Sequence, residues 1–246
     1  MGTVLLFTSG KGGTGKSTAI SAIASCIAAL GKRVLCIDMD LRLPNLDLLL
    51  GMSDTTTLDI SDVAAGRNTL EEAVAEHPLV PGLCLLSGPA VVCPTEINAH
   101  TLARVVAEAK KSYDFCFIDG PAGLDDLFLL TAQDADGVMI VTTPDASSQR
   151  DAQRMVMELD ELGVAHIRML LNRVRVKLLT QSGVNVDDMI DFVGAPLLGI
   201  IPEDADVIAA ASFLRLLILY SRREASRAFL RIAKRMLGQA VPLAHR

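Results

Sequence analysis

A glycine-rich run near the start of the chain most constrains its fold. Residues 10–18 read GKGGTGKST, which satisfies the pattern GxxxxGK[ST], and a short apolar run, 3–8, directly precedes them. The apolar segment 17–30 that follows has the length and composition of a helix. In a strand, loop and helix of this kind, the backbone N–H groups of the loop point into one concavity that binds phosphate. The sequence therefore predicts a P-loop nucleotide-binding fold.

The residues of this loop have distinct expected roles. Glycines let the backbone curl around the phosphates, and the following helix adds its positive N-terminal end. Lys16 is expected to reach the β and γ phosphates, while the Ser17 hydroxyl ligates Mg²⁺. The expected nucleotide contacts are Gly12, Gly13, Thr14, Gly15, Lys16, Ser17 and Thr18. The alternative is a glycine-rich turn without a ligand.

The rest of the chain alternates short apolar runs with longer amphipathic ones. Further strands are expected at 33–38, 83–87, 115–119, 138–143, 167–172 and 197–201, and further helices at 99–112, 148–162 and 205–213. Half of the 246 residues are hydrophobic but only 4% are aromatic, which is typical of buried aliphatic strands covered by helices. We therefore predict an α/β fold with a mainly parallel, doubly wound sheet flanked by helices, as one domain over residues 1–246.

Three carboxylates follow predicted strands on the edge where ligands bind in parallel sheets. The strand 33–38 ends in Asp38, Asp40 follows two residues later, and the period of two places both carboxylates on the same side. Asp119 closes an apolar strand, which is the Walker B arrangement that binds Mg²⁺ through water. The turn 120–123 after it, GPAG, is expected to respond to the γ phosphate. Helix-capping or turn aspartates remain the alternative for Asp38 and Asp40.

The run KGGTGKST resembles the deviant Walker A motif of the MinD/ParA family of P-loop ATPases. This resemblance implies that Lys11 reaches across a dimer interface to the partner's nucleotide, much as an arginine finger does. It also implies that Asp40 positions the attacking water and that Asp38 supports the water shell of Mg²⁺. The resemblance places adenine near Asn172, Pro202 and Glu203, each of which could equally lie in an ordinary turn.

Further segments narrow the resemblance to one branch of the family. Residues 45–51, NLDLLLG, and 141–152, VTTPDASSQRDA, are similar to segments of the MinD branch, which helps to place the bacterial division septum. Flagellar-number ATPases share much of this pattern. The resemblance implies an ATP-hydrolysing switch, an ATP-dependent homodimer and a regulatory or effector partner from the division machinery. A non-hydrolysing interaction protein is disfavoured because Lys11, Lys16, Asp40 and Asp119 are all present.

Two departures from the family pattern affect the expected site. Residues 41–44 read LRLP, so Pro44 stands where relatives have arginine, and DxDxRxP is also similar to bacterial tyrosine autokinases. Those kinases carry a tyrosine cluster, whereas this chain has only Tyr113 and Tyr220. Relatives also have Gly-x-Pro where this chain has Leu214, Arg215 and Leu216. We expect this second change to alter the backbone beside the adenine.

Charge is unevenly distributed along the chain. The net charge is −6, but residues 213–246 carry +7 and the remainder −13, which disfavours DNA as partner and with it a ParA-like DNA-partition ATPase. A basic amphipathic helix is predicted at 225–237. Its apolar face is Phe229, Ile232, Ala233 and Met236, opposite Arg227, Arg231, Lys234 and Arg235. This helix either packs on the domain or lies on an anionic membrane, and the chain lacks the further amphipathic segment of its relatives.

Cysteine usage and hydropathy indicate the compartment. Cys26, Cys36, Cys84, Cys93 and Cys116 form no CxxC pair, which favours reduced thiols and disfavours zinc or the paired cysteines of an iron–sulfur carrier. No signal peptide precedes the first strand, and no uncharged apolar stretch reaches the ~18 residues of a spanning helix. We expect a cytoplasmic protein whose membrane contact, where it occurs, is peripheral at the inner face of the cell membrane.

Overall fold

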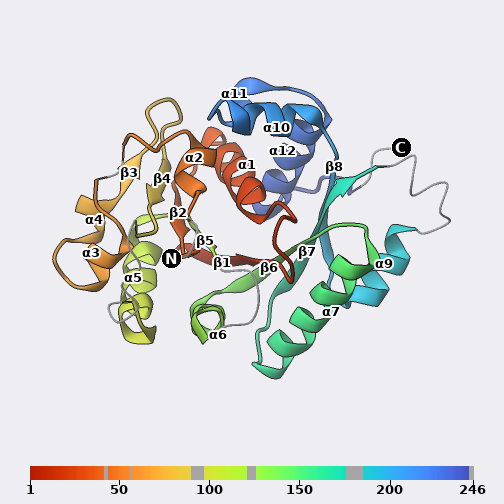
Figure 1. The fold of residues 1–246 in the computed structure, drawn as a ribbon, viewed down its shortest axis with the longest axis horizontal. Helices are drawn as coiled ribbons and strands as arrows, with labels where there is room; N and C mark the ends of the chain where they lie inside the picture. Colours follow the sequence, from red (N-terminus) through yellow and green to blue (C-terminus); the bar gives the residue numbers. More distant parts are fainter. Residues whose placement is uncertain (42–43, 56, 90–96, 121–125, 176–184, 244–246) are drawn as a thin grey trace.

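One eight-stranded sheet forms the centre of the computed structural model, which describes residues 1–41, 44–55, 57–89, 97–120, 126–175 and 185–243 (Figure 1). The strand order is β3-β4-β2-β5-β1-β6-β7-β8. Only the edge strand β3 is antiparallel to its neighbour, so the carboxyl ends of the other seven strands share one edge. The strands are β1 Thr3–Thr8, β2 Val34–Asp38, β3 Ala75–Glu76, β4 Leu83–Leu86, β5 Phe115–Asp119, β6 Gly137–Thr142, β7 Ile167–Val174 and β8 Leu197–Pro202.

Helices cover both faces of this sheet (Figure 1). One face packs against α1 Lys16–Ala29, α2 Leu46–Leu50, α10 Ala205–Ser212, α11 Leu217–Tyr220 and α12 Glu224–Met236. The other packs against α3 Ile60–Ala64, α4 Leu70–Ala73, α5 Ala99–Ser112, α6 Asp126–Asp134, α7 Ala146–Glu161 and α9 Val186–Val193. In β1, Val4 and Leu6 enter one core while Phe7 enters the other. This two-sided burial explains why the strands are apolar throughout.

The predicted α/β fold is confirmed, with strand and helix ends within two residues of those expected. The elements that the sequence pattern missed are β3 and the short helices α2, α3, α4, α6, α9 and α11. Helices α3, α4 and α9 are N-capped by Asp59, Thr69 and Asn185, each in a capping box. Such helices depend on local hydrogen bonds and have too few turns for a periodic signal. The single-domain organisation stays a prediction, supported by the one sheet and its two cores.

The basic helix α12 packs its apolar face onto α1 and β8. Phe229, Ile232 and Ala233 are buried there, and Gly199 of β8 permits the close approach of Ile232, since an added Cβ would lie 2.4 Å from its Cγ1. Arg235, which belongs to the predicted basic face, is half-buried, as are Arg231 and Lys234. The guanidinium of Arg235 donates to the carbonyl oxygens of Leu198 at 2.8 Å and Val241 at 2.9 Å. No helix in the described ranges is long and apolar enough to span a bilayer.

Candidate functional site

A cavity of about 450 Å³ opens above the P-loop at the carboxyl edge of the sheet. Gly15, with a left-handed φ of 92°, caps the N-terminus of α1, and the first turn of α1 carries no acidic side chain. The positive end of the helix therefore stays available to an anion. All of the predicted loop contacts, Gly12 to Thr18, line this cavity, together with Ser9, Asp40, Asn45, Leu48, Leu49, Arg173, Ala211 and Leu214.

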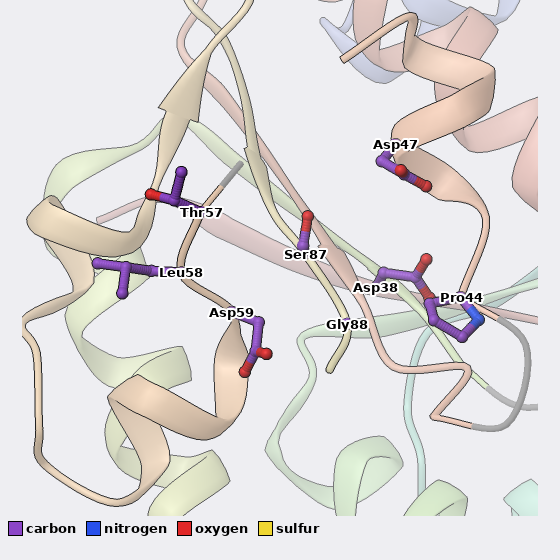
Figure 2. A pocket seen from close by; sticks show the side chains of 8 residues that line it. All are labelled: Asp38, Pro44, Asp47, Thr57, Leu58, Asp59, Ser87 and Gly88. Carbon is purple, nitrogen blue, oxygen red and sulfur yellow. The ribbon is translucent and has the colours of Figure 1, made fainter. Parts of the chain in front are cut away.

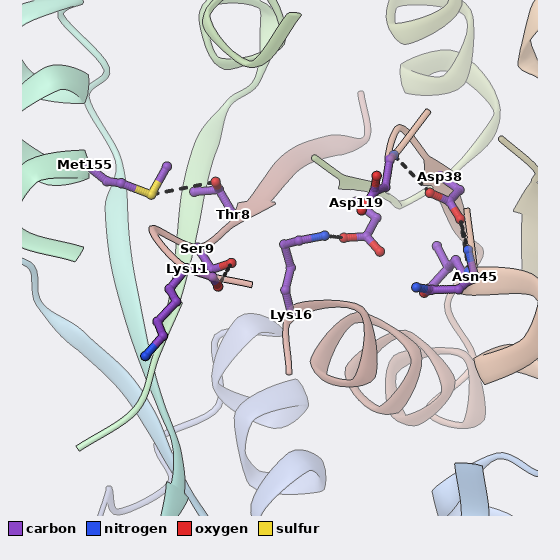
Figure 3. Close-up of polar contacts among 10 residues, drawn as sticks. Thr8, Ser9, Lys11, Lys16, Asp38, Asn45, Asp119 and Met155 are labelled. Atoms are coloured by element: carbon purple, nitrogen blue, oxygen red, sulfur yellow. Dashed lines mark hydrogen bonds and ion pairs between the residues drawn. The ribbon is translucent and has the colours of Figure 1, made fainter. Parts of the chain in front are cut away.

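Lys16 and Asp119 form a buried ion pair at the floor of the site (Figure 3). Lys16 is 8% exposed and Asp119 1%. Burial raises the pKa of Asp119, and the charge and hydrogen bond of Lys16 oppose this rise. The other carboxylate oxygen, Oδ2, is buried and accepts no hydrogen bond from the described residues. This oxygen gives a cation or its bound water a place to bind beside the phosphates.

Asp38 caps a helix instead of facing the cavity. Its Oδ1 accepts the backbone N–H of Asp40 at 3.0 Å, and its Oδ2 accepts those of Asn45 and Leu46, both at 3.0 Å, at the start of α2 (Figure 3). Burial raises the pKa of Asp38 to about 6, against the opposing bond from Leu46. Its expected support of the Mg²⁺ water shell stays a prediction, although both oxygens are already engaged.

Asp38 and Asp40 line different cavities, so the expectation that strand periodicity places them on one side does not hold. Strand β2 ends at Asp38, and the chain then turns so that only Asp40 reaches the P-loop cavity. Asp38 borders a second cavity of about 220 Å³ (Figure 2). Its other lining residues are Pro44, Asp47, Thr57, Leu58, Asp59, Ser87 and Gly88. Pro44 thus lies beside Asp38, away from the P-loop cavity; residues 42–43 and the turn 121–123 lie outside the described residues.

The donor set of the P-loop cavity fits Mg²⁺ bound together with a nucleotide. Within the described ranges no three His, Cys, Asp or Glu side chains gather closely enough to hold a metal alone. Mg²⁺ usually keeps several waters and takes its other ligands from a carboxylate and from phosphate oxygens. Ser17 at the cavity wall and the buried Asp119 supply the protein oxygens for that arrangement.

Lys11 extends away from Lys16 and Asp119 (Figure 3). It is exposed and does not line the cavity of its own chain. Although burial alone would raise the pKa of Asp145, hydrogen bonds from Thr143 and Ser148 and the charge of Lys11 hold it at about 2. Lys11 therefore lies near the start of α7. Its role in a partner's site stays a prediction.

The residues expected to read adenine do not line the cavity. The Asn172 amide donates to the carbonyl oxygen of Thr14 at 2.7 Å and accepts the N–H of Arg173 at 2.9 Å, so this side chain supports the P-loop from behind. Glu203 is exposed and paired with Arg175, while Pro202 pairs with β7 in the sheet. These contacts involve residues far apart in the sequence, and no local pattern marks them.

Two strained residues form the far wall of the cavity instead. Arg173 and Leu214, with φ of 55° and 51°, are the non-glycine residues of positive φ in the described part of the chain. Leu214 ends α10: its N–H donates to Ala211 and the next N–H, of Arg215, to Ala210. This is the Schellman cap, which glycine usually completes. Leu216 has a φ of −57°, close to that of proline. The expected change of backbone at the missing Gly-x-Pro is therefore wrong.

Comparison with known proteins agrees with this geometry. Residues 5–217 match the family model described as CobQ/CobB/MinD/ParA nucleotide binding domain. The septum site-determining protein MinD of Synechocystis sp. is 34% identical over 98% of this chain and 92% of its own length. The MinC:MinD cell division protein complex of Aquifex aeolicus superposes with a TM-score of 0.92, at 32% identity and 99% coverage of both chains.

A third relative is a nucleotide complex. The septum site-determining protein MinD of Pyrococcus horikoshii complexed with Mg-ADP superposes with a TM-score of 0.84, at 28% identity and 96% coverage of both chains. The match of the family model covers the P-loop, all three predicted carboxylates and the far wall of the cavity. The chain therefore belongs to the CobQ/CobB/MinD/ParA nucleotide-binding family, and within that family it is a P-loop ATPase of the MinD type.

Proposed function

We propose that this chain is a molecular switch that binds and hydrolyses Mg-ATP and acts with the division machinery in placing the bacterial septum. The observation that carries the proposal is the cavity that Gly12 to Thr18 and Asp40 line at the positive end of α1. A MinD relative of nearly the same length forms a complex with Mg-ADP, and another forms a complex with MinC. We place the protein in the cytoplasm, where its nucleotide and a MinC-like partner would be available.

Different residues of the P-loop cavity have different proposed roles in ATP hydrolysis. Backbone N–H groups of the P-loop hold the phosphates. Lys16, which pairs with Asp119 in the structure, would neutralise the β and γ phosphates, and Ser17 and Asp119 would hold the cation. Asp40, on the cavity wall, orients the attacking water. Mg²⁺, when bound, neutralises charge that develops on the phosphates.

A homodimer completes the proposed site. Lys11 is exposed and directed away from Lys16 and Asp119 of its own chain, so it can cross to a second copy (Figure 3). ATP between two copies would then hold the dimer together, and hydrolysis would release it. A switch of this kind offers its dimeric state to a division protein only while ATP is intact.

Asp40→Ala tests the assignment of turnover. We expect the variant to bind a fluorescent ATP analogue as tightly as the unsubstituted protein, because the P-loop is unchanged, and to lose at least ~100-fold in phosphate release. Asp54→Ala removes an exposed carboxylate outside the cavity and serves as the matched control. Unchanged turnover in Asp40→Ala would refute the assignment.

Lys11→Ala tests the dimer, and the Asp40→Ala background keeps ATP intact during the measurement. With Mg-ATP, we expect Asp40→Ala to elute as a dimer in gel filtration and the double variant Lys11→Ala/Asp40→Ala as a monomer. Lys111→Ala, which removes an exposed lysine at the end of α5, is the matched control and should remain dimeric. A dimer that survives Lys11→Ala excludes the proposed contact across the interface.

A further inference from the structure

The five-residue helix α2 forms one wall of the P-loop cavity. Leu48 and Leu49 of this helix line the cavity, as does Asn45 directly before it. Helix α2 lies beside α1, on the side toward β4 (Figure 1). Isolated helices of so few residues are not stable in water, because their ends leave most backbone groups unpaired. The position of this wall therefore depends on contacts from other elements.

Side chains from three other elements satisfy backbone groups at the ends of α2. The carboxylate of Asp38, at the end of β2, accepts two N–H groups at the N-terminus. Ser21 of α1 donates to the carbonyl oxygen of Leu49 at 2.9 Å. The imidazole of His77, directly after β3, forms a hydrogen bond with the backbone of Leu50, the last residue of α2. Helix α2 is therefore held at both ends.

His77 connects α2 to the hairpin formed by β3 and β4. Its Nδ1 accepts the N–H groups of Leu79 at 3.0 Å and Val80 at 3.1 Å. A neutral imidazole that accepts at Nδ1 carries its proton on Nε2, so the bond with Leu50 is a donation from Nε2 to the carbonyl oxygen. Burial lowers the pKa of His77, which is 6% exposed, and the bond with Leu50 opposes this shift in part. The neutral form is therefore the one that holds α2.

The end of α2 that His77 holds also touches the far wall of the cavity. Gly51 follows Leu50, and a Cβ at Gly51 would lie 2.6 Å from the carbonyl oxygen of Leu214. Leu214 lines the P-loop cavity, as α2 does. A shift of this end of α2 therefore moves two walls of the cavity. Asp40 precedes the opposite end of α2, which has its own cap, so such a shift should leave the attacking water in place.

We propose that His77 is a positioning residue for the nucleotide: by donating to the carbonyl oxygen of Leu50, it fixes α2 in the arrangement that binds ATP. This inference rests on the proposed ATPase function. His77 does not line the cavity, so it acts on the ligand only through α2. Loss of the bond to Leu50 should therefore weaken the binding of ATP and preserve the rate at which bound ATP is hydrolysed.

Two substitutions separate the two sides of the His77 imidazole. His77→Asn keeps an acceptor close to the position of Nδ1, because an asparagine side chain accepts N–H groups two residues ahead, but it is too short to donate to Leu50. His77→Gln keeps a donor near the position of Nε2 and leaves Leu79 and Val80 without their acceptor. Each variant loses one side of the imidazole, so urea unfolding should show that both are less stable than the unsubstituted chain.

Binding of a fluorescent ATP analogue and phosphate release are measured with Mg²⁺ on the same folded samples. We expect His77→Asn to raise the Kd of the analogue and the KM for ATP about fivefold, which corresponds to the ~1 kcal/mol of one hydrogen bond. Its kcat should stay within about twofold, because the P-loop and Asp40 are unchanged. His77→Gln should keep both Kd and KM close to those of the unsubstituted chain. A purely structural role would instead change the activity of both variants in the order of their stability.

Glu76→Ala is the matched control in the same hairpin. Oε1 of Glu76 accepts the N–H of Gly82 at 2.7 Å, so the variant loses a hydrogen bond of the hairpin while those at the ends of α2 remain. Its Kd and KM should equal those of the unsubstituted chain. Ser21→Ala removes the neighbouring bond at the end of α2 and should raise Kd and KM as His77→Asn does. His77→Ser, which also keeps a short acceptor and lacks the donor, repeats the test where His77→Asn does not fold.

Other results overturn the inference in recognisable ways. Equal Kd values for His77→Asn and His77→Gln, whether raised or unchanged, exclude a role for the bond to Leu50. A lower kcat at unchanged KM in His77→Asn shows that His77 acts on hydrolysis and not on binding. If the unsubstituted chain neither binds the analogue nor releases phosphate, the proposed function fails as well. If it does both, and His77→Asn has the same Kd, only the positioning role of His77 fails.

Discussion

The left-handed backbone at Leu214 predicts that glycine is more stable than alanine at this position, which is the reverse of their usual order in a helix. An L-residue other than glycine costs about 1–2 kcal/mol in the left-handed region, and Leu214 has a φ of 51°. Its side chain is 47% exposed, so truncation to alanine loses about half of the ~1.5–3 kcal/mol of a buried leucine. Leu214→Ala should therefore lower the free energy of unfolding by ~1 kcal/mol while keeping the strain.

Leu214→Gly loses one more carbon atom than Leu214→Ala, the Cβ, and also relieves the strain. Glycine gives back about 0.4–1 kcal/mol through the greater freedom of the unfolded chain. The strain released is larger, so Leu214→Gly should be more stable than Leu214→Ala by about 0.5–1 kcal/mol. In an ordinary helix the order is reversed, because glycine is ~1 kcal/mol less favourable than alanine.

Leu230 in α12 supplies the control for this comparison. It is 36% exposed and lies inside a helix, so Leu230→Gly should be less stable than Leu230→Ala by ~1 kcal/mol. Urea unfolding of the four variants measures both differences in the free energy of unfolding. In thermal unfolding, 1 kcal/mol corresponds to a shift in Tm of about 2–4 °C for a chain of this size. Finding alanine more stable than glycine at both positions would refute the argument from strain.

Two further predictions concern Asp38 and Gly15. Because burial raises its pKa from 3.8 to about 6, Asp38 keeps its proton in the folded chain between about pH 4 and pH 6, after the unfolded chain has released it. The contribution of Asp38 to stability therefore falls as pH rises through that window. Urea unfolding at pH 4, 5 and 6 should show a steeper decline in the free energy of unfolding for the unsubstituted chain than for Asp38→Asn. Parallel declines would contradict the raised pKa. In Gly15→Ala, the new Cβ would lie 2.4 Å from Nδ2 of Asn172 at a φ of 92°, so the free energy of unfolding should fall by ~1–3 kcal/mol. The control is Gly12→Ala, whose Cβ meets nothing within 4 Å; equal losses in the two variants would contradict the steric argument.

The features that were predicted best from the sequence are those that depend on residues close together in the chain, namely the P-loop and the central strands. The P-loop pattern occupies eight consecutive positions, and the seven predicted contacts in and beside it, Gly12 to Thr18, all line the cavity. The central strands are apolar runs of five or six residues because both faces are covered, and they were found with nearly correct ends. Asp119 ends such a run, and it lies at the predicted end of β5, where it pairs with Lys16 of the P-loop.

Side chains whose partners are remote were not predictable in the same way. Asn172 bonds to Thr14, 158 positions away, so its residue type and turn context gave only a general hint of nucleotide binding. The capping role of Asp38 depends on α2, a five-residue helix that is too short for a periodic signal. The backbone contacts of Arg235 are remote in a similar way, because the carbonyl groups that it binds belong to β8 and to the chain after α12.

The turn at Leu214 shows why loss of a glycine does not imply loss of a backbone shape. Its two capping hydrogen bonds to Ala210 and Ala211 involve backbone atoms alone, so any residue that accepts the strain can complete them. Gly51, at the end of α2, leaves space for the backbone of this turn, because a Cβ at Gly51 would lie 2.6 Å from the carbonyl oxygen of Leu214. The glycine that this turn needs for space is therefore on the neighbouring helix. A substitution at Gly51 should disturb the far wall of the cavity more than the leucine at 214 does.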